Sequence, residues 1–244
     1  MIQVHGVSKR FASLVLDDVH LSVPRGSLVG LVGPGASGKS VLVKAITGLV
    51  RPDAGRIVVD GQELTSLGEL ELQAARARFG MLFQQNALFD FMTVEGNVAF
   101  PLRRLTTLAE PEIRARARDR LARVGLAGFE DRMPAALSGG QKKRVGIARA
   151  TITDAPIRLY DEPAAGLDPV TSQKIFDLLR EEQRAAGATA IMISSDVDRL
   201  LSVVDRIVMM VRGRVVFDGP VDGARSSENA MVRQFLRGET EGPL

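Results

Sequence analysis

Residues 33–40 combine glycines, a lysine and a serine at the spacing that phosphate binding requires. The stretch matches the pattern G-x-x-x-x-G-K-[ST] without a mismatch. Its glycines allow a tight loop whose backbone N–H groups point inward at phosphate oxygens, and a helix that follows adds the positive end of its dipole. Lys39 would reach the β- and γ-phosphates of a nucleotide, and the Ser40 hydroxyl would bind Mg²⁺. The predicted phosphate-binding residues are Gly33, Pro34, Gly35, Ala36, Ser37, Gly38, Lys39 and Ser40.

A second pair of chemical groups ends an apolar stretch that begins at Ile157. Asp161 follows Leu159 and Tyr160, and Glu162 comes next. Acidic residues also end strands simply for solubility, so the pair alone indicates little. Together with the phosphate loop, Asp161 is the candidate for a second Mg²⁺ contact, and Glu162 is placed to orient or deprotonate the attacking water. The two patterns predict a P-loop NTPase.

The elements that must position these groups can be read from the hydrophobic pattern. The apolar run 27–32 predicts a buried strand directly before the loop, and the spacing of apolar residues predicts a helix over 39–49, continuing through Gly48. Further strands are predicted at 19–23 and 56–60. From Gln141 onward helices and strands alternate, which indicates an α/β fold with a mostly parallel sheet. The segments of that alternation are 142–150, 158–160, 172–184, 189–194 and 206–211.

Residues 86–136 have a different texture, rich in Arg, Ala and Leu at helical spacing. Pro101, Pro111, Gly125 and Gly128 punctuate the stretch, which we interpret as a helical insertion. Its arginines outnumber its acidic residues between positions 103 and 123. That excess is compatible with a solvated helix face, and also with a contact surface for a partner or for lipid headgroups.

Composition excludes several classes of protein. The 244 residues are 45% hydrophobic and 25% charged, which is ordinary for a globular chain and not for a disordered or fibrous one. The absence of cysteine excludes disulfides and thiolate metal sites. One Tyr and no Trp leave few platforms for stacking nucleic-acid bases, and the net charge of +3 is small. No apolar run reaches the ~20 residues that span a bilayer, and no nucleic-acid partner is expected.

The stretch from Leu137 to Gln141 assigns the branch of the P-loop NTPases. It closely resembles the signature motif of ATP-binding-cassette (ABC) transporter ATPases. The resemblance implies ATP and Mg²⁺ as cofactors and a homodimer in which each signature caps the γ-phosphate held by the other copy's phosphate loop. A simple helix cap is the alternative for the motif alone. The candidate signature residues are Leu137, Ser138, Gly139, Gly140 and Gln141.

Three more positions match the family pattern. Phe11 corresponds to the aromatic residue that stacks on adenine, with a core Phe as the alternative. Gln84 corresponds to the glutamine that touches Mg²⁺ or water and links the helical insertion to the site; Gln85 is the less favoured candidate, and a surface amide the alternative. Asp168, in Ala165–Asp168, matches the loop that communicates across the dimer, with a plain turn as the alternative.

The resemblance covers residues 1–225 and implies a P-loop NTPase fold of ABC type: a mostly parallel sheet core with an antiparallel β subdomain and a helical insertion. The expected parts are an ATPase core of residues 1–85 and 145–225, a helical subdomain of residues 86–144 with the signature, and a C-terminal tail of residues 226–244. The tail from Arg237 onward is expected to be frayed or bound to a partner.

One position departs from the family. A histidine that senses the γ-phosphate is expected after a late core strand, but the sequence there is Ser194-Ser195-Asp196. The chain's histidines, His5 and His20, both precede the phosphate loop. A serine hydroxyl has a shorter reach and carries no positive charge near pH 7. A slow ATPase, a trapped variant, a binding module without turnover and a site that relies on Glu162 all remain open.

Two segments resemble ATPases of Mla/Mce-type lipid transporters. They are residues 86–103 and the tail segment 232–238, in which Phe235 is the expected apolar anchor for a dimer or partner contact; the alternative is a turn packed on its own domain. The resemblance implies a phospholipid cargo, an integral membrane permease, an MCE-domain lipid-binding protein and a small STAS-domain subunit. It also implies a cytoplasmic chain held at the inner face of the membrane by its permease. The alternatives are the ATPase of a small-solute importer and a soluble ABC protein without a transport role.

Overall fold

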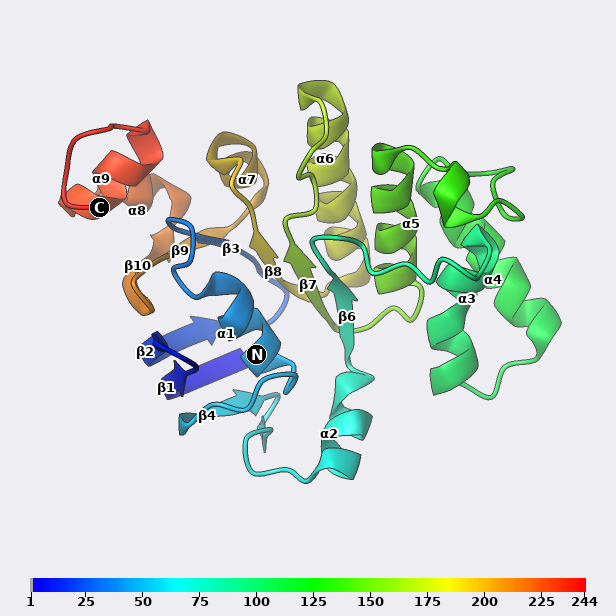
Figure 1. The fold of residues 1–244 in the computed structure, drawn as a ribbon, viewed down its shortest axis with the longest axis horizontal. Coiled ribbons are helices and arrows are strands. Elements are labelled where there is room, and N and C mark those ends of the chain that lie inside the picture. Colours follow the sequence, from blue (N-terminus) through cyan, green and yellow to red (C-terminus); the bar gives the residue numbers. More distant parts are fainter. Residues whose placement is uncertain (1) are drawn as a thin grey trace. The chain divides into compact units, whose positions relative to one another are not determined.

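The computed structural model describes residues 2–244 and divides the chain into two compact units (Figure 1). The first is made of Met1–Arg76 and Thr189–Leu244, and the second of Ala77–Ala188. The parts expected from the sequence, residues 1–85 with 145–225, 86–144 and 226–244, follow the family's motifs and not compactness, and they stay a prediction.

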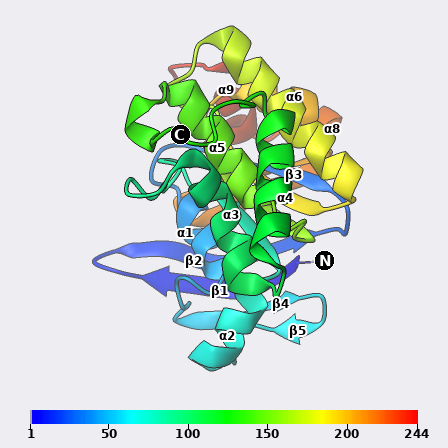
Figure 2. The same ribbon diagram turned by 90° about the vertical axis from the view of Figure 1, so that its right-hand side faces the viewer.

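The first unit contains two sheets. An antiparallel sheet has the order β2-β1-β4-β5, and Figure 2 shows β1 and β2 as a long hairpin. Its strands are β1 (Ile2–Arg10), β2 (Leu14–Val23), β4 (Ala54–Val59) and β5 (Gln62–Glu63). In the other sheet β3 pairs in parallel with β8 and β9, and β10 pairs antiparallel with β9. Its strands are β3 (Leu28–Val32), β8 (Thr189–Ile193), β9 (Arg206–Val211) and β10 (Arg214–Pro220).

The helices of the first unit include the one that follows the phosphate loop. That helix ends at Ile46 and not at residue 49 as predicted, because Gly48 takes a left-handed conformation (φ 69°) and donates its N–H to Ala45. The apolar pattern continues through this cap, which is why the sequence predicted a longer helix. The helices are α1 (Lys39–Ile46), α2 (Glu69–Arg76), α7 (Val197–Val203), α8 (Val221–Arg225) and α9 (Ala230–Arg237).

The second unit joins a parallel strand pair to a group of helices. Its strands are β6 (Phe79–Leu82) and β7 (Ile157–Asp161), and its helices are α3 (Val94–Leu105), α4 (Glu110–Arg123), η1 (Pro134–Ala136), α5 (Gly139–Thr151) and α6 (Pro169–Ala186). Helices α3, α4 and α5 pack against one another (Figure 2). Pro101, predicted to interrupt the helical segment, lies inside α3. The mostly parallel core, the antiparallel β subdomain and the helical insertion are confirmed.

The C-terminal tail, expected to be frayed or bound to a partner, is not frayed. The backbone N–H of Leu244 donates to Gln234 Oε1 at 2.9 Å, and Gln234 Nε2 donates to the Glu239 carbonyl at 3.3 Å. The tail therefore closes back on α9. In that helix Val232 is fully buried while Phe235 is only half-buried, so the segment packs on its own domain through Val232.

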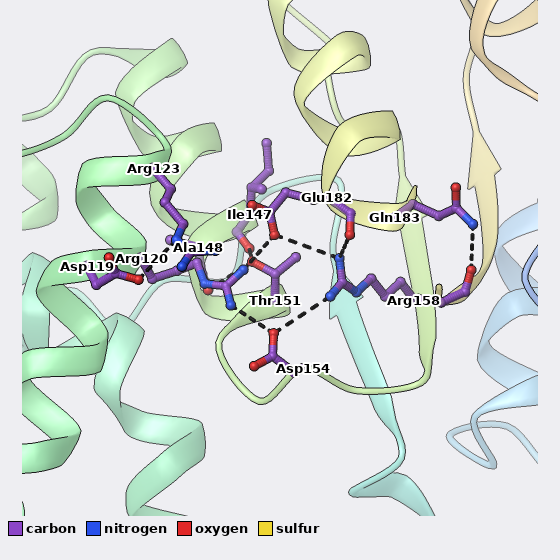
Figure 3. Close-up of polar contacts among 11 residues, drawn as sticks. Asp119, Arg120, Arg123, Ile147, Ala148, Thr151, Asp154, Arg158, Glu182 and Gln183 are labelled. Carbon is purple, nitrogen blue, oxygen red and sulfur yellow. Dashed lines mark hydrogen bonds and ion pairs between the residues drawn. The ribbon is translucent and has the colours of Figure 1, made fainter. Parts of the chain in front are cut away.

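Four charged residues of the second unit form a network around β7, which we call the Arg158–Glu182 network (Figure 3). Arg158 is fully buried and donates from Nη1 to the Glu182 carbonyl at 2.8 Å. Arg120 donates to Glu182 Oε2 at 2.6 Å and to Asp154 Oδ1 at 2.8 Å. The network thus ties β7, α4, α6 and the loop before β7 together.

Glu182→Ala is expected to lower the free energy of unfolding by about 3 kcal/mol, because it leaves two buried guanidinium groups short of their shared carboxylate. For a chain of this length that corresponds to a fall in Tm of roughly 6–12 °C. Thermal and urea unfolding measure it. Glu181→Ala is the matched control, since Glu181 is exposed on the same helix. A loss below about 1 kcal/mol in Glu182→Ala would contradict the role given to the network.

Candidate nucleotide site

The phosphate loop lies between the buried strand β3 and helix α1, as the sequence predicts. Lys39 Nζ donates to the carbonyl oxygens of Gly33 and Pro34, at 2.8 Å each, and to Ser37 Oγ at 3.1 Å. The ammonium group therefore spans the opening of its own loop. These three acceptors are neutral oxygens, and an anionic phosphate oxygen is a stronger acceptor for an ammonium group, so Lys39 is suited to transfer its hydrogen bonds to a bound phosphate.

Two of the loop's glycines are required by its shape. A Cβ on Gly33 (φ 140°) would lie 1.9 Å from the Met210 carbonyl oxygen, and one on Gly38 (φ 98°) would lie 2.6 Å from that of Val15. No side chain fits at either position without moving backbone. The backbone of Val15 and Met210 thus packs tightly against the loop, which preorganises the N–H groups of the loop.

A pocket of about 370 Å³ opens at this loop, within the size range of small-molecule sites. Its wall includes residues 36–41 of the loop and α1, residues 13–15 before and within β2, and Arg212 and Gly213 of the turn between β9 and β10. The Gly213 N–H donates to the Ser37 carbonyl at 3.2 Å, which joins that turn to the loop.

Phe11 lies in the turn between β1 and β2 and is 55% exposed. The alternative of a core phenylalanine is therefore wrong. The ring lies 5.4 Å from Lys9 Nζ, a distance typical of a cation–π contact. An exposed aromatic face in this position remains available for stacking on a base.

Ser195 follows the carboxyl end of β8 and is exposed. Strands β3 and β8 are parallel, and Leu31 near the end of β3 pairs with Ile193, the last residue of β8, so both strands end at the same edge of the sheet. Ser195 therefore lies at the edge of this sheet where the phosphate loop leaves β3. Asp196 caps α7 by accepting the Arg199 N–H at 3.3 Å.

In the second unit, the two predicted carboxylates end strand β7. Asp161 is its last residue and is buried, and Glu162 takes a left-handed backbone conformation with φ 50°. Such a conformation is uncommon for a residue other than glycine and costs energy unless the surroundings hold it. This backbone conformation turns the chain sharply at Glu162, the residue predicted to be the general base.

The signature residues begin helix α5 as a capping box. Gln141 N–H donates to Ser138 Oγ at 3.3 Å, and Ser138 N–H donates to Gln141 Oε1 at 2.8 Å. The Ser138 hydroxyl can still donate its own hydrogen to an anion. A Cβ on Gly140 would lie 3.6 Å from Leu167 and Thr171, so the signature packs beside the Ala165–Asp168 loop.

Asp168 caps α6, accepting the N–H groups of Val170 and Thr171 at 3.0 Å each. The side chain of Thr171 is the main cause that lowers the pKa of the Asp168 carboxyl, followed by the Thr171 backbone N–H, so the group stays ionised. The turn therefore has a structural use, whatever further contact Asp168 makes.

Sequence reasoning missed two basic residues that hold Gln84 and the segment after it. Lys143, buried on α5, donates to the carbonyls of Gln84 and Glu162, and Arg149 donates to those of Asn86 and Ala87. Asn86 and Ala87 both have positive φ. The sequence shows only a lysine and an arginine within a predicted helix and gives no signal of the carbonyls that they bind.

An apolar groove of about 330 Å³ lies beside this segment in the second unit. Arg149 forms part of its wall, 5.8 Å from the Phe89 ring centroid. The apolar residues of the wall include Phe79, Met81, Phe83, Phe89, Phe100 and Leu105.

Comparison with known proteins assigns the family. The model of the family "ABC transporter" matches residues 16–165. The chain is 40% identical to the probable ribonucleotide transport ATP-binding protein Mkl of Mycobacterium tuberculosis, with all of this chain and 68% of Mkl covered. This chain belongs to the ABC transporter ATPases.

Two further relatives of this ABC ATPase are named for other substrates. The intermembrane phospholipid transport system ATP-binding protein MlaF of Haemophilus influenzae is 37% identical, with 100% of this chain and 93% of MlaF covered. The methionine import ATP-binding protein MetN of Caulobacter vibrioides is 42% identical, with 100% of this chain and 74% of MetN covered. The family is thus established, and the cargo is not.

A solved structure supports the same assignment and the activity. The ATP-binding cassette MJ0796, a dimer in a post-hydrolysis state bound to ADP and Pi, superposes on this ABC ATPase with a TM-score of 0.84 at 31% identity. The match covers 91% of this chain and 99% of MJ0796. The chain is therefore an ATPase and the ATP-binding subunit of an ABC transporter.

The donors of this ABC ATPase suit a magnesium ion bound together with nucleotide. Mg²⁺ in such sites takes one or two protein oxygens and completes its shell with phosphates and water. Residues 2–244 hold no cluster of three or more His, Cys, Asp or Glu that could cage a metal alone. Ser40 in the first unit and Asp161 in the second each carry a side-chain oxygen, the ligand type that Mg²⁺ prefers. Across residues 2–244, every helix is too short or too polar to traverse a bilayer.

Proposed function

We propose that this ABC ATPase powers lipid transport, with a phospholipid as cargo. The observation that carries the proposal concerns segment 86–103, which resembles the ATPases of Mla/Mce-type transporters. Ala87, Phe89, Phe100 and Pro101 of that segment are among the residues that line the apolar groove. The residues that resemble lipid-transport ATPases thus lie on a surface suited to receive an apolar segment of a partner. The phospholipid substrate named for MlaF supports the same proposal.

The proposed assembly contains two copies of this chain and an integral membrane permease whose cytoplasmic segment occupies the groove. An MCE-domain lipid-binding protein and a STAS-domain subunit are the further proposed partners. The chain would then be cytoplasmic and peripheral to the inner membrane. The dimeric state of MJ0796 supports the pairing of two copies.

The proposed chemistry divides phosphate binding from water activation. The loop N–H groups and Lys39 hold the phosphates, Ser40 and Asp161 bind Mg²⁺, and Gln84 orients the ion or the attacking water. Mg²⁺, when bound, neutralises charge on the β- and γ-phosphates. Glu162 orients or deprotonates the water that attacks the γ-phosphorus.

The remaining motif residues act on the base or across the dimer. Phe11 stacks on adenine with its exposed ring. The Ser138 hydroxyl and the N-terminus of α5 face the γ-phosphate bound by the other copy, and Asp168 communicates between the two sites. ATP binding closes the dimer, and hydrolysis with phosphate release reopens it.

Ser195→His is expected to raise steady-state turnover about tenfold, equivalent to ~1.4 kcal/mol of transition-state stabilisation, because an imidazole reaches further and can carry positive charge. Phosphate release by the assembled complex measures it. Ser202→His, on the exposed face of α7, is the control. Unchanged turnover in Ser195→His would contradict the prediction, because it would show that a histidine at position 195 does not speed ATP hydrolysis in this protein.

A small-solute importer is the second candidate, favoured by the 42% identity to MetN. Purification of the tagged chain from its own membranes in mild detergent, with mass spectrometry of proteins and lipids, separates the two. The proposal predicts a permease, an MCE-domain protein and bound phospholipid. Recovery of a permease with a soluble solute-binding protein would contradict the lipid cargo and leave the ATPase chemistry intact.

A further inference from the structure

One buried ammonium group in the second unit has a geometry that the proposed mechanism does not use. Lys143 is 5% exposed and lies in the second turn of α5. Its Nζ donates to the Gln84 carbonyl and, at 3.1 Å, to the Glu162 carbonyl. A buried lysine is uncommon and is retained where its hydrogen bonds are satisfied.

The two carbonyls belong to the ends of neighbouring strands. Strands β6 and β7 are parallel, and Leu82 pairs with Tyr160. Gln84 and Glu162 each lie two residues beyond that pair. The ammonium group therefore joins the two chain segments at the point where both leave the sheet, and both carry a side chain with a proposed role at the reacting phosphate.

Glu162 needs such a restraint more than most residues do. Its φ of 50° is in the left-handed region, where a residue with a side chain persists only if its surroundings hold it. A hydrogen bond to the carbonyl of that same residue fixes the orientation of the following peptide and so limits relaxation of the turn. The direction of the carboxylate depends on that backbone conformation.

The charges around Lys143 fit this arrangement. Burial lowers the pKa of the ammonium group, and the charges of Glu162 and Asp161 act in the opposite direction. Lys143 is thus within electrostatic reach of both carboxylates that end β7. Its own helix begins at Ser138, so a single rigid element carries the signature and the restraint on Glu162.

We propose that Lys143 is a positioning residue for ATP hydrolysis: it holds the backbone of Gln84 and Glu162 so that their side chains meet the attacking water. This inference rests on the proposed roles of Glu162 and Gln84. Since α5 also begins with the signature, Lys143 connects the hydrolytic residues of one nucleotide site to the residues that cap the other.

The test compares ATP turnover and ATP affinity between the parent chain and its variants, each assembled with its partners. Lys143→Met keeps the length of the side chain and removes the donor. We expect kcat per bound ATP to fall about tenfold or more, because small displacements of catalytic groups have large kinetic effects. ATP affinity should stay within about twofold, since the phosphate loop belongs to the other compact unit. Lys143→Arg, which restores a cationic donor, should recover part of the turnover.

Lys174→Met is the matched control, because Lys174 is exposed on α6 of the same unit and its loss removes the same charge. Counting kcat per ATP-binding site excludes a simple loss of folded protein. Parental kcat in Lys143→Met, or equal loss of kcat and ATP affinity, would overturn the positioning role. If Lys143→Met does not fold, Lys143→Leu, which also removes the donor from an apolar side chain of shorter length, is measured in the same way against the same outcomes.

Glu162→Gln in the same assay distinguishes a failure of the role proposed for Lys143 from a failure of the role proposed for Glu162. If Glu162→Gln stops hydrolysis while Lys143→Met hydrolyses ATP normally, only the role of Lys143 is wrong. If Glu162→Gln hydrolyses ATP at the parental rate, the proposed general base is wrong, and the inference about Lys143 is overturned with it.

Discussion

Replacing Glu162 with Gln is expected to lower steady-state phosphate release at least about a hundredfold, the contribution typical of a positioned general base. Gln keeps the size and an acceptor oxygen of the side chain but cannot take a proton from water near pH 7. ATP binding should persist, because the proposed phosphate ligands are unchanged. ATP would then accumulate in the closed dimer, which size-exclusion chromatography with Mg²⁺ and ATP can detect.

Glu181→Gln is the control for this experiment. Glu181 is exposed on α6, and its substitution removes the same charge from the same unit. It should hydrolyse ATP at the parental rate and should not trap a dimer. A Glu162→Gln protein with parental turnover would remove Glu162 from the mechanism. A protein that loses ATP binding instead would make Glu162 a structural residue of the strained turn.

Lys39→Ala should weaken ATP binding about a hundredfold or more, because the lysine is expected to make charge-assisted hydrogen bonds to two phosphates, each worth roughly 1.5–3 kcal/mol. In the present structure its ammonium group contacts Gly33, Pro34 and Ser37, so the substitution also removes three bonds that shape the loop. Equilibrium binding of a fluorescent ATP analogue measures the effect.

Lys44→Ala is the matched control, because Lys44 is exposed on the same helix α1. Its ATP affinity should equal that of the parent, and the melting temperatures of both variants should show that the chain folds. Binding by Lys39→Ala within about threefold of the parent would contradict the assignment of the phosphate loop, since even one charge-assisted hydrogen bond is worth more.

The sequence was sufficient for the parts of this molecule that local chemistry determines. The phosphate loop needs glycines at fixed positions, and the contacts of Gly33 and Gly38 show why: backbone from β2 and β9 fills the space of a side chain. The alternation of apolar strands and helices after residue 141 likewise predicted the strands β7, β8 and β9 within one or two residues.

Features that depend on tertiary contacts could not be predicted. Lys143 and Arg149 look like ordinary helix-surface residues in the sequence, and only the packing of α5 shows that they bind the carbonyls around Gln84. Arg158 lies in an apolar strand pattern, and its charge is accommodated by Glu182, which is 24 residues away. Hydrophobic periodicity carries no information about such partners.

The helix ends show the same limit on a smaller scale. The apolar spacing around α1 continues past its last residue because Leu49 and Val50 are apolar as well, yet Gly48 ends the helix through its backbone conformation. The C-terminal tail was expected to be frayed or bound to a partner, and the Gln234 side chain bonds to residues 239 and 244 of the same chain. Both outcomes depend on hydrogen bonds that residue type alone does not specify.

The central claim, that this ATPase drives phospholipid movement, is tested most directly by reconstitution. The purified complex is placed in vesicles with a labelled phospholipid, and transfer between these vesicles and an acceptor MCE-domain protein or acceptor vesicles is followed with and without ATP. The account predicts transfer that requires ATP and is absent in Glu162→Gln. Lipid transfer independent of ATP, together with ATP-driven uptake of methionine or another small solute by the same complex, would contradict it.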